Sequence, residues 1–152
     1  MDMFIIKDDA NIDPSVFLNH GETFGGFKKK QQADKALEFF FNNIPVWKKF
    51  HELSVFVMEK EGKDKLGVAF IWNQLRWYYY FELKQREVAF KLNNNYTPLY
   101  SRVFNSQLEN AEMPAFYNVR TSLFDSLDLS SAYNAESGGQ FWVYLRRFWN
   151  PK

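Results

Sequence analysis

The chain has 152 residues, a formal net charge of +1 and an aromatic content of 20%, from 17 Phe, 8 Tyr and 5 Trp. This length predicts a single globular domain over residues 1–152, and so many aromatic side chains exclude a largely disordered chain. Because the sequence contains no cysteine, disulfides, thiol nucleophiles and thiolate metal sites are excluded.

Hydropathy and charge distribution narrow the class of protein further. Residues 1–7 lack the apolar stretch of a signal peptide, and no apolar run approaches the roughly 18 residues of a membrane span, so we expect a cytoplasmic protein without membrane association. Residues 28–91 carry thirteen basic and eight acidic side chains. This bias is weaker than the dense basic stripe that is typical of nucleic-acid-binding domains, although it permits an anionic partner.

The first third of the chain predicts one short strand and one helix. Met3 to Lys7 is typical of a strand, and an acidic loop and a glycine-containing connection, His20 to Phe27, follow it. That connection does not match a phosphate-binding glycine motif. From Lys29 to about Asn43 apolar residues recur at helical spacing, and Pro45 ends the pattern. The apolar positions of this predicted helix are Ala33, Ala36, Leu37, Phe40 and Ile44.

Residues 52–92 alternate between two faces, which predicts a four-stranded antiparallel meander. A turn at Asn73-Gln74 would pair Phe70 with Trp77 and Val68 with Tyr79. Connections at Gln85-Arg86 and at residues 61–64 would extend the same apolar face to further strands. A slip of one residue would break every one of these pairings.

The last third predicts mostly short elements. Thr97-Pro98 is a good start for a helix through about Gln107, with apolar residues inward. A short helix over residues 119–127, a polar loop over 128–140 and a strand from Phe141 to Trp149 would follow. The expected fold class is therefore α+β: a curved antiparallel meander of four to six strands, packed on one face by the N-terminal-half helix, with short C-terminal helices.

The second face of the predicted sheet is the best functional clue. It combines tyrosines with cations and apolar residues, a composition that is enriched in the cores of protein interfaces. We expect this face to bind a partner, most readily a protein, through Arg76, Tyr78, Tyr80, Lys84, Phe56 and Met58. The sequence also fits a structural alternative, in which another segment covers Phe56 and Met58 and only the tyrosine hydroxyls reach water.

Two other activities remain open on the same residues. Tyrosines and cations on one sheet face would suit single-stranded nucleic acid, with bases stacked on phenols and phosphates on Arg76 and Lys84. Glu82-Leu83-Lys84 resembles the strand-borne Glu-x-Lys of PD-(D/E)XK nucleases, which would imply a metal-dependent nuclease. The two histidines, His20 and His51, lack the i+3 or i+4 histidine partner of a metal site. We therefore expect no catalytic residue, metal or cofactor.

The stretch from Asn43 to Lys49, followed by aromatic residues, is similar to the opening of YezG-like immunity proteins. Those proteins resist bacterial toxins by binding them, so the resemblance implies stoichiometric binding without catalysis. Together with the aromatic face, it favours a small non-enzymatic binding protein of the inhibitor, immunity or anti-defence type. The sequence leaves the identity of the partner and the oligomeric state open.

Overall fold

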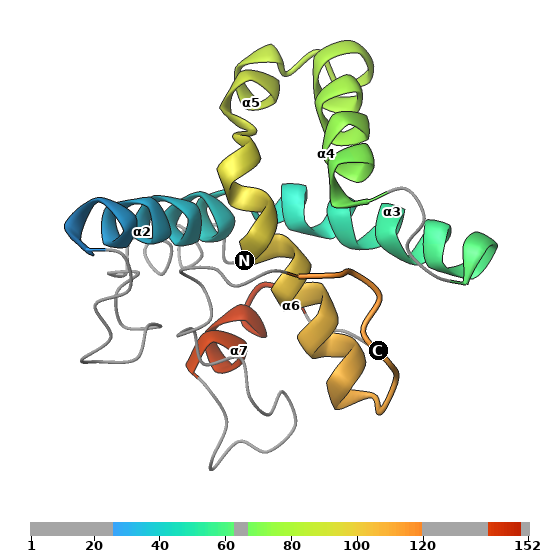
Figure 1. Ribbon diagram of the computed structural model, residues 1–152. Coiled ribbons are helices and arrows are strands. Elements are labelled where there is room, and N and C mark those ends of the chain that lie inside the picture. The colour runs from blue at the N-terminus through green and yellow to red at the C-terminus, as the bar shows by residue number, and fades with distance from the viewer. Residues whose placement is uncertain (1–25, 63–66, 120–139, 150–152) are drawn as a thin grey trace. The chain divides into compact units, whose positions relative to one another are not determined.

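The computed structural model describes residues 26–62, 67–119 and 140–149, and every regular element within these ranges is a helix (Figure 1). The chain divides into two compact units, one formed by Met1–Ile44 with Thr121–Lys152 and the other by Pro45–Arg120. The prediction of a single domain stays a prediction. None of the described helices is long and apolar enough to cross a lipid bilayer.

In the first unit, α2 (Gly26–Asn42) confirms the predicted N-terminal-half helix. Its buried side chains follow helical spacing, since they include Ala33, Ala36, Leu37, Phe40 and Phe41. The ring of Phe141, in α7 (Gln140–Leu145), lies 5.4 Å from Phe40 and 5.1 Å from Phe41 between ring centroids. These ring contacts fix α2 and α7 to one another.

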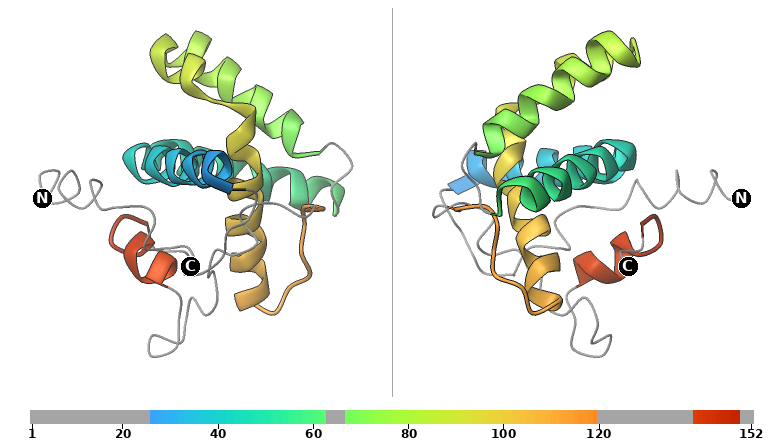
Figure 2. Two further views of the ribbon diagram at one scale, coloured as in Figure 1. Left: turned by 60° about the vertical axis from the view of Figure 1, so that its left-hand side comes forward. Right: turned by 90° about the vertical axis from the view of Figure 1, so that its right-hand side faces the viewer.

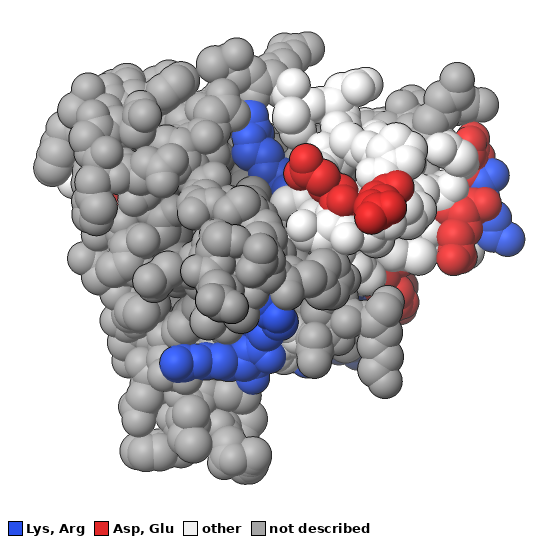
Figure 3. Space-filling view, turned by 90° about the horizontal axis from the view of Figure 1, so that it is seen from below, with Lys and Arg blue, Asp and Glu red and all other residues white. Residues whose placement is uncertain are grey.

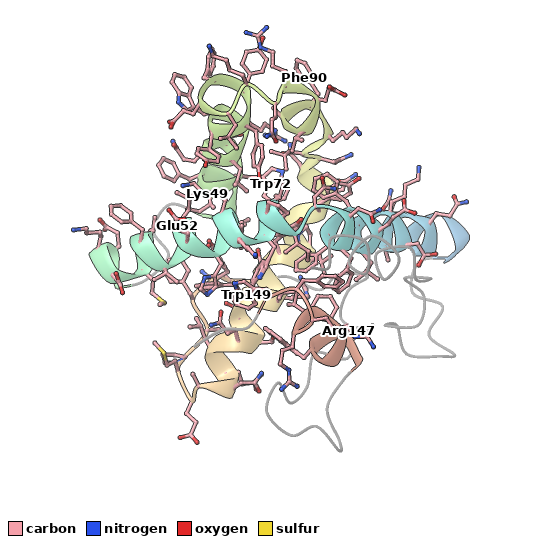
Figure 4. The ribbon with its side chains drawn as sticks, turned by 180° about the vertical axis from the view of Figure 1, so that it is seen from behind. Lys49, Glu52, Trp72, Phe90, Arg147 and Trp149 are labelled. Carbon is pink, nitrogen blue, oxygen red and sulfur yellow. The ribbon has the colours of Figure 1, made fainter. Side chains whose placement is uncertain are left out.

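The strand predicted from Phe141 to Trp149 is wrong, because α7 and a turn occupy these residues. Phe141, Trp142 and Leu145 are buried, and this i, i+1, i+4 spacing marks one face of a helix. Trp149 comes back against Trp142, with 6.4 Å between ring centroids, and Figure 4 labels it near α7.

The second unit contains the remaining helices in chain order. They are α3 (Ile44–Glu61), α4 (Val68–Trp77), the π-helix η2 (Tyr78–Glu82), α5 (Arg86–Lys91), the 3-10 helix η3 (Asn94–Tyr96) and α6 (Thr97–Asn110). The chain runs outward along α4 and η2, reverses, and returns along α5 into α6 (Figures 1 and 2). The predicted helix beginning at Thr97-Pro98 is confirmed as α6, with Pro98 in its first turn.

The reversals in this unit occur where the backbone takes positive φ angles. Gly62 closes α3 at φ 79°, and its amide donates to the Met58 carbonyl at 2.8 Å, as in a glycine helix cap. Lys84 takes φ 57° between η2 and α5. The predicted connections near residues 61–64 and 85–86 thus coincide with real helix ends, whereas the predicted turn at Asn73-Gln74 lies inside α4.

The core of the second unit is a cluster of aromatic rings from α3, α4 and α6. Trp72 and Tyr100 pack edge to face, with centroids 4.9 Å apart, and Phe50 lies 6.1 Å from Trp72 and 5.3 Å from Tyr100. All three side chains have no exposed surface. Figure 4 shows Trp72 at the inner end of α4, next to α3, so this cluster supports the outward-reaching part of the unit.

The α+β prediction is wrong, because none of the described residues between 52 and 92 forms a strand. The predicted sheet would bury Trp72 and Trp77 on one face, but Trp72 is buried and Trp77 is 55% exposed. Buried Trp72, Leu75 and Tyr79 follow the i, i+3, i+7 spacing of a helix face. In a segment rich in aromatic residues, a short stretch of sequence can match both the two-residue repeat of a strand and the 3.6-residue repeat of a helix. Alternation alone therefore led to a wrong prediction.

Several sequence predictions fall outside the described residues. These are the strand at residues 3–7, most of the glycine-containing connection and nearly all of the segments predicted as a helix at 119–127 and a loop at 128–140. The structure therefore tests only the predictions made for residues 26–62, 67–119 and 140–149.

His51 gives the second unit a pH-dependent stability. Its imidazole packs between Trp47, at 5.7 Å, and Phe104, at 5.5 Å between ring centroids. Burial lowers the pKa of His51 below its usual 6.5, and a hydrogen bond from the imidazole to the Gln107 side chain opposes this only in part. The folded state therefore disfavours the charged imidazole.

We expect the free energy of unfolding to decrease as the pH falls below 6.5, because unfolded His51 takes up a proton more readily than folded His51. Above pH 6.5 both states are largely neutral and the full stability is present. Urea unfolding at pH 7.5 and pH 5 measures the effect. His51→Gln should reduce the difference between the two pH values; an unchanged difference would contradict this role for His51.

Candidate protein-binding groove

An open groove of about 410 Å³ lies between the α4–η2 segment and α5 in the second unit. We call it the aromatic groove. Its lining comes from one face of α4 and η2 and from two consecutive residues of α5: Asn73, Arg76, Trp77, Tyr80, Phe81, Ala89 and Phe90. Apolar atoms make up most of its surface. Figure 4 shows Phe90 at the outer end of this helical pair, far from Trp72.

Four aromatic rings form the walls of the groove. Trp77 and Phe81 lie 4.5 Å apart between centroids, tilted by 45°, and Tyr80 meets Phe81 at 4.7 Å and 62°. Tyr80 also meets Phe90 of α5 edge to face, at 5.7 Å and 77°. The tilted rings give the groove an uneven apolar surface with room for inserted side chains.

These rings are far more exposed than the unit's core requires. Phe90 is 77% exposed, Trp77 55% and Phe81 53%. Apolar surfaces exposed together on one face mark interaction sites, whereas single exposed apolar residues are ordinary. The grouping of these rings, rather than the exposure of any one of them, identifies the groove as the candidate site.

The π-helix η2 places two of the groove's rings. The amide of Leu83 donates to the carbonyl of Tyr78 at 2.9 Å, which is the i to i+5 bond of a π-helix. Such widened turns are rare in proteins as a whole, but those that occur are often found at functional sites. Here the turn holds Tyr80 and Phe81 at the groove while Tyr79 points into the core, where burial raises its pKa to about 12.

Arg76 holds the two walls together. Its Nε and Nη2 donate to the carbonyl of Leu92 at 3.2 and 2.7 Å, and Nη1 donates to Asn73 Oδ1 at 2.8 Å. Nη2 also donates to Asn94 Oδ1. Because Leu92 ends α5 and Asn73 belongs to α4, this guanidinium fixes the spacing of the groove. Arg76 is a positioning residue as well as a lining residue.

The predicted binding residues do not share one surface. Arg76 and Tyr80 line the aromatic groove, but Tyr78 turns away and lies beneath the ammonium group of Lys49, 4.3 Å from its ring centroid. Phe56 and Met58 belong to α3 and do not line the groove. Two of the six predicted residues, Arg76 and Tyr80, therefore line the groove. The other rings that line it were not predicted.

Glu82 and Lys84 do not form the arrangement that the nuclease resemblance implies. Glu82 ends η2 and Lys84 lies in the following turn, so neither stands on a strand, and both are exposed. Within residues 26–62, 67–119 and 140–149, no three His, Asp or Glu side chains gather to hold a metal ion.

The predicted sheet placed Trp77, Phe81 and Phe90 on its buried face, so these residues were not among the predicted binding residues. The signal that identifies them is the spacing of the groove face along one helix: residues 73, 76, 77, 80 and 81 follow i, i+3, i+4, i+7 and i+8. That spacing becomes informative only when the segment is treated as helical.

Comparison of the chain with protein-family models, curated proteins and solved structures finds no match. The resemblances to YezG-like immunity proteins and to PD-(D/E)XK nucleases therefore gain no support from these comparisons. What the protein does has to be argued from the aromatic groove itself.

Proposed function

We propose that the protein is a non-enzymatic binding protein that holds a protein partner stoichiometrically in the aromatic groove. The observation that carries the proposal is the set of four rings, three of them more than half exposed, that line one open groove of about 410 Å³. Trp, Tyr and Phe are enriched at the centres of protein interfaces, where burial of their large surfaces supplies most of the binding energy.

The architecture supports a preformed binding surface. Arg76 fixes the spacing of the two walls through its hydrogen bonds to Leu92 and Asn73. The aromatic core around Trp72 anchors the base of α4. A rigid groove loses little conformational entropy on binding, so more of the contact energy appears as affinity. The chain contains no cysteine, which is compatible with the reducing cytoplasm in which we place the protein.

Photo-crosslinking from two matched positions tests the proposal. Phe90 and Phe56 are both exposed phenylalanines, at 77% and 57%, but only Phe90 lines the groove. A benzoyl-phenylalanine at position 90 should crosslink to a protein in the native cell extract, before and after nuclease treatment, and the same residue at position 56 should not. Equal crosslinking from both positions, or crosslinking to nuclease-sensitive material, would contradict the proposal.

A further inference from the structure

The charged side chains that line the aromatic groove or contact its rings are both arginines. Arg76 lines the groove, and the guanidinium carbon of Arg86 lies 4.8 Å from the centre of the Tyr80 ring. Arg86 precedes Phe90 by four residues in α5, so the two side chains share one face of that helix. The groove therefore presents two guanidinium groups beside its rings.

Two carboxylates lie close to these cations in the sequence but do not line the groove. Glu87 precedes Phe90 by three residues and so lies beside the same face of α5, but it is absent from the groove lining and forms no ion pair with Arg86. Glu82 ends η2, is exposed, and does not line the groove. No acidic side chain is present among the groove's lining residues.

The two arginines have different roles toward an incoming ligand. The guanidinium of Arg76 is occupied by the Leu92 carbonyl and by the side chains of Asn73 and Asn94. The side chain of Arg86 forms no ion pair or hydrogen bond within the part of the chain that the structure describes, and its guanidinium rests on the face of Tyr80. Arg86 can thus bind a carboxylate through two parallel hydrogen bonds without losing an existing one.

The length of the groove sets the size of the ligand. Its longer wall runs from Asn73 to Phe81, which corresponds to about 12 Å along a helix axis. Two turns of a second helix cover about this distance and present apolar side chains at i, i+3, i+4 and i+7, as in other helix-in-groove complexes.

We infer that the aromatic groove binds an acidic amphipathic helix of a protein partner, with apolar side chains among Trp77, Tyr80, Phe81 and Phe90 and a carboxylate on Arg86. This inference rests on the proposed function and names the chemistry of the partner. Charge complementarity selects the partner, and burial of the rings supplies the affinity.

The geometry around Tyr80 favours a protein helix over single-stranded nucleic acid. Successive bases stack on open aromatic faces, but one face of Tyr80 is already covered by Arg86, and the planes of Phe81 and Phe90 are steeply inclined to the Tyr80 ring. Elsewhere, basic and acidic side chains are both present on the described surface seen in Figure 3, so that face does not form the basic stripe that tracks a phosphate backbone.

Fluorescence anisotropy with two labelled peptides tests the inference on the full chain. One peptide of about sixteen residues, long enough to form a helix, carries leucines at i, i+3, i+4 and i+7 and glutamates on its flanks. The other has every glutamate replaced by lysine. We expect the acidic peptide to bind at least tenfold more tightly, and Arg86→Glu to abolish or reverse this preference.

Lys91→Glu is the matched control, because it makes the same change in net charge at an exposed α5 position outside the groove. It should change the affinity of the acidic peptide less than twofold. An equal loss from Lys91→Glu and Arg86→Glu would mean that overall charge, and not the Arg86 contact, governs binding, and would overturn the inference.

Three further outcomes would also overturn it: equal affinity for the two peptides, tighter binding of labelled oligothymidylate, or a concentration-dependent dimer that Phe90→Ala dissociates in sedimentation experiments. If peptide discrimination fails while position 90 still crosslinks to a partner protein, the charge selection is wrong and the proposed function stands. If crosslinking fails as well, the proposed function is wrong too.

Discussion

Trp72→Ala should lower the free energy of unfolding by about 3–5 kcal/mol, the usual loss for a large aromatic side chain removed from a core. Trp72 has no exposed surface, and its ring contacts Tyr100 at 4.9 Å and Phe50 at 6.1 Å between centroids. Its removal leaves a cavity between α3, α4 and α6 that these neighbouring rings cannot fill without leaving their own contacts.

Trp72→Phe separates the loss of packing from the loss of the indole N–H. The Nε1 atom of Trp72 is buried without a hydrogen-bond partner among the described residues, so the substitution removes an unsatisfied donor and keeps an aromatic ring. We expect Trp72→Phe to cost much less than Trp72→Ala. Chemical denaturation of both variants, followed by circular dichroism, measures the difference.

Trp77→Ala is the comparison that distinguishes the helical fold from the predicted sheet. Trp77 is 55% exposed, so its removal should change the free energy of unfolding by no more than about 0.5 kcal/mol, as is usual for surface positions. A sheet that buried both tryptophans on one face would be destabilised by either substitution. Comparable destabilisation by Trp72→Ala and Trp77→Ala would therefore contradict the helical arrangement.

The sequence was informative about where helices begin and end, but less so about what lies between the ends. The N-terminal-half helix and the helix starting at Thr97 were predicted because long segments with helical spacing are flanked by clear signals, such as Pro45 and Pro98. Gly62 and the region of Lys84 were also predicted as reversals, and both have positive φ angles. These signals depend only on residues that are neighbours in the chain, so the predicted helix ends are correct even though the predicted fold class is wrong.

The type of structure between residues 67 and 92 was not predictable in the same way. Eleven of its residues are aromatic or β-branched, which favours strands when considered alone. The helices form nevertheless because Trp72, Leu75 and Tyr79 can be buried together only on a helical face. Tertiary packing therefore overrides local preference, and the π-helix at Tyr78–Glu82 has no sequence signal of its own.

The sequence indicated which residue types would form the candidate site, but it did not indicate how these residues are arranged in space. Arg76 and Tyr80 were identified because tyrosine and arginine are typical of interfaces, and both line the groove. The exposed rings of Trp77, Phe81 and Phe90 were assigned to the core because the sheet model required a buried apolar face. Knowing which aromatic residues are exposed depends on the fold, and composition does not supply it.

Trp77→Ala should also have the largest effect on partner binding. Tryptophan is the residue most enriched among binding hot spots, and truncating a hot spot typically costs about 2 kcal/mol or more, or roughly a thirtyfold loss of affinity. Trp77 stands at the centre of the groove face, against Phe81 at 4.5 Å and one turn from Asn73. The fold should be unchanged, since the side chain is more than half exposed.

The most direct test of the aromatic groove is a calorimetric titration of the partner captured from position 90 against the wild type, Trp77→Ala and Phe56→Ala. All three proteins must first show the same unfolding midpoint. The groove predicts that Trp77→Ala loses affinity about thirtyfold, whereas Phe56→Ala, an exposed aromatic deletion outside the groove, binds like the wild type. Unchanged affinity in Trp77→Ala, or an equal loss in both variants, would contradict the groove as the binding surface.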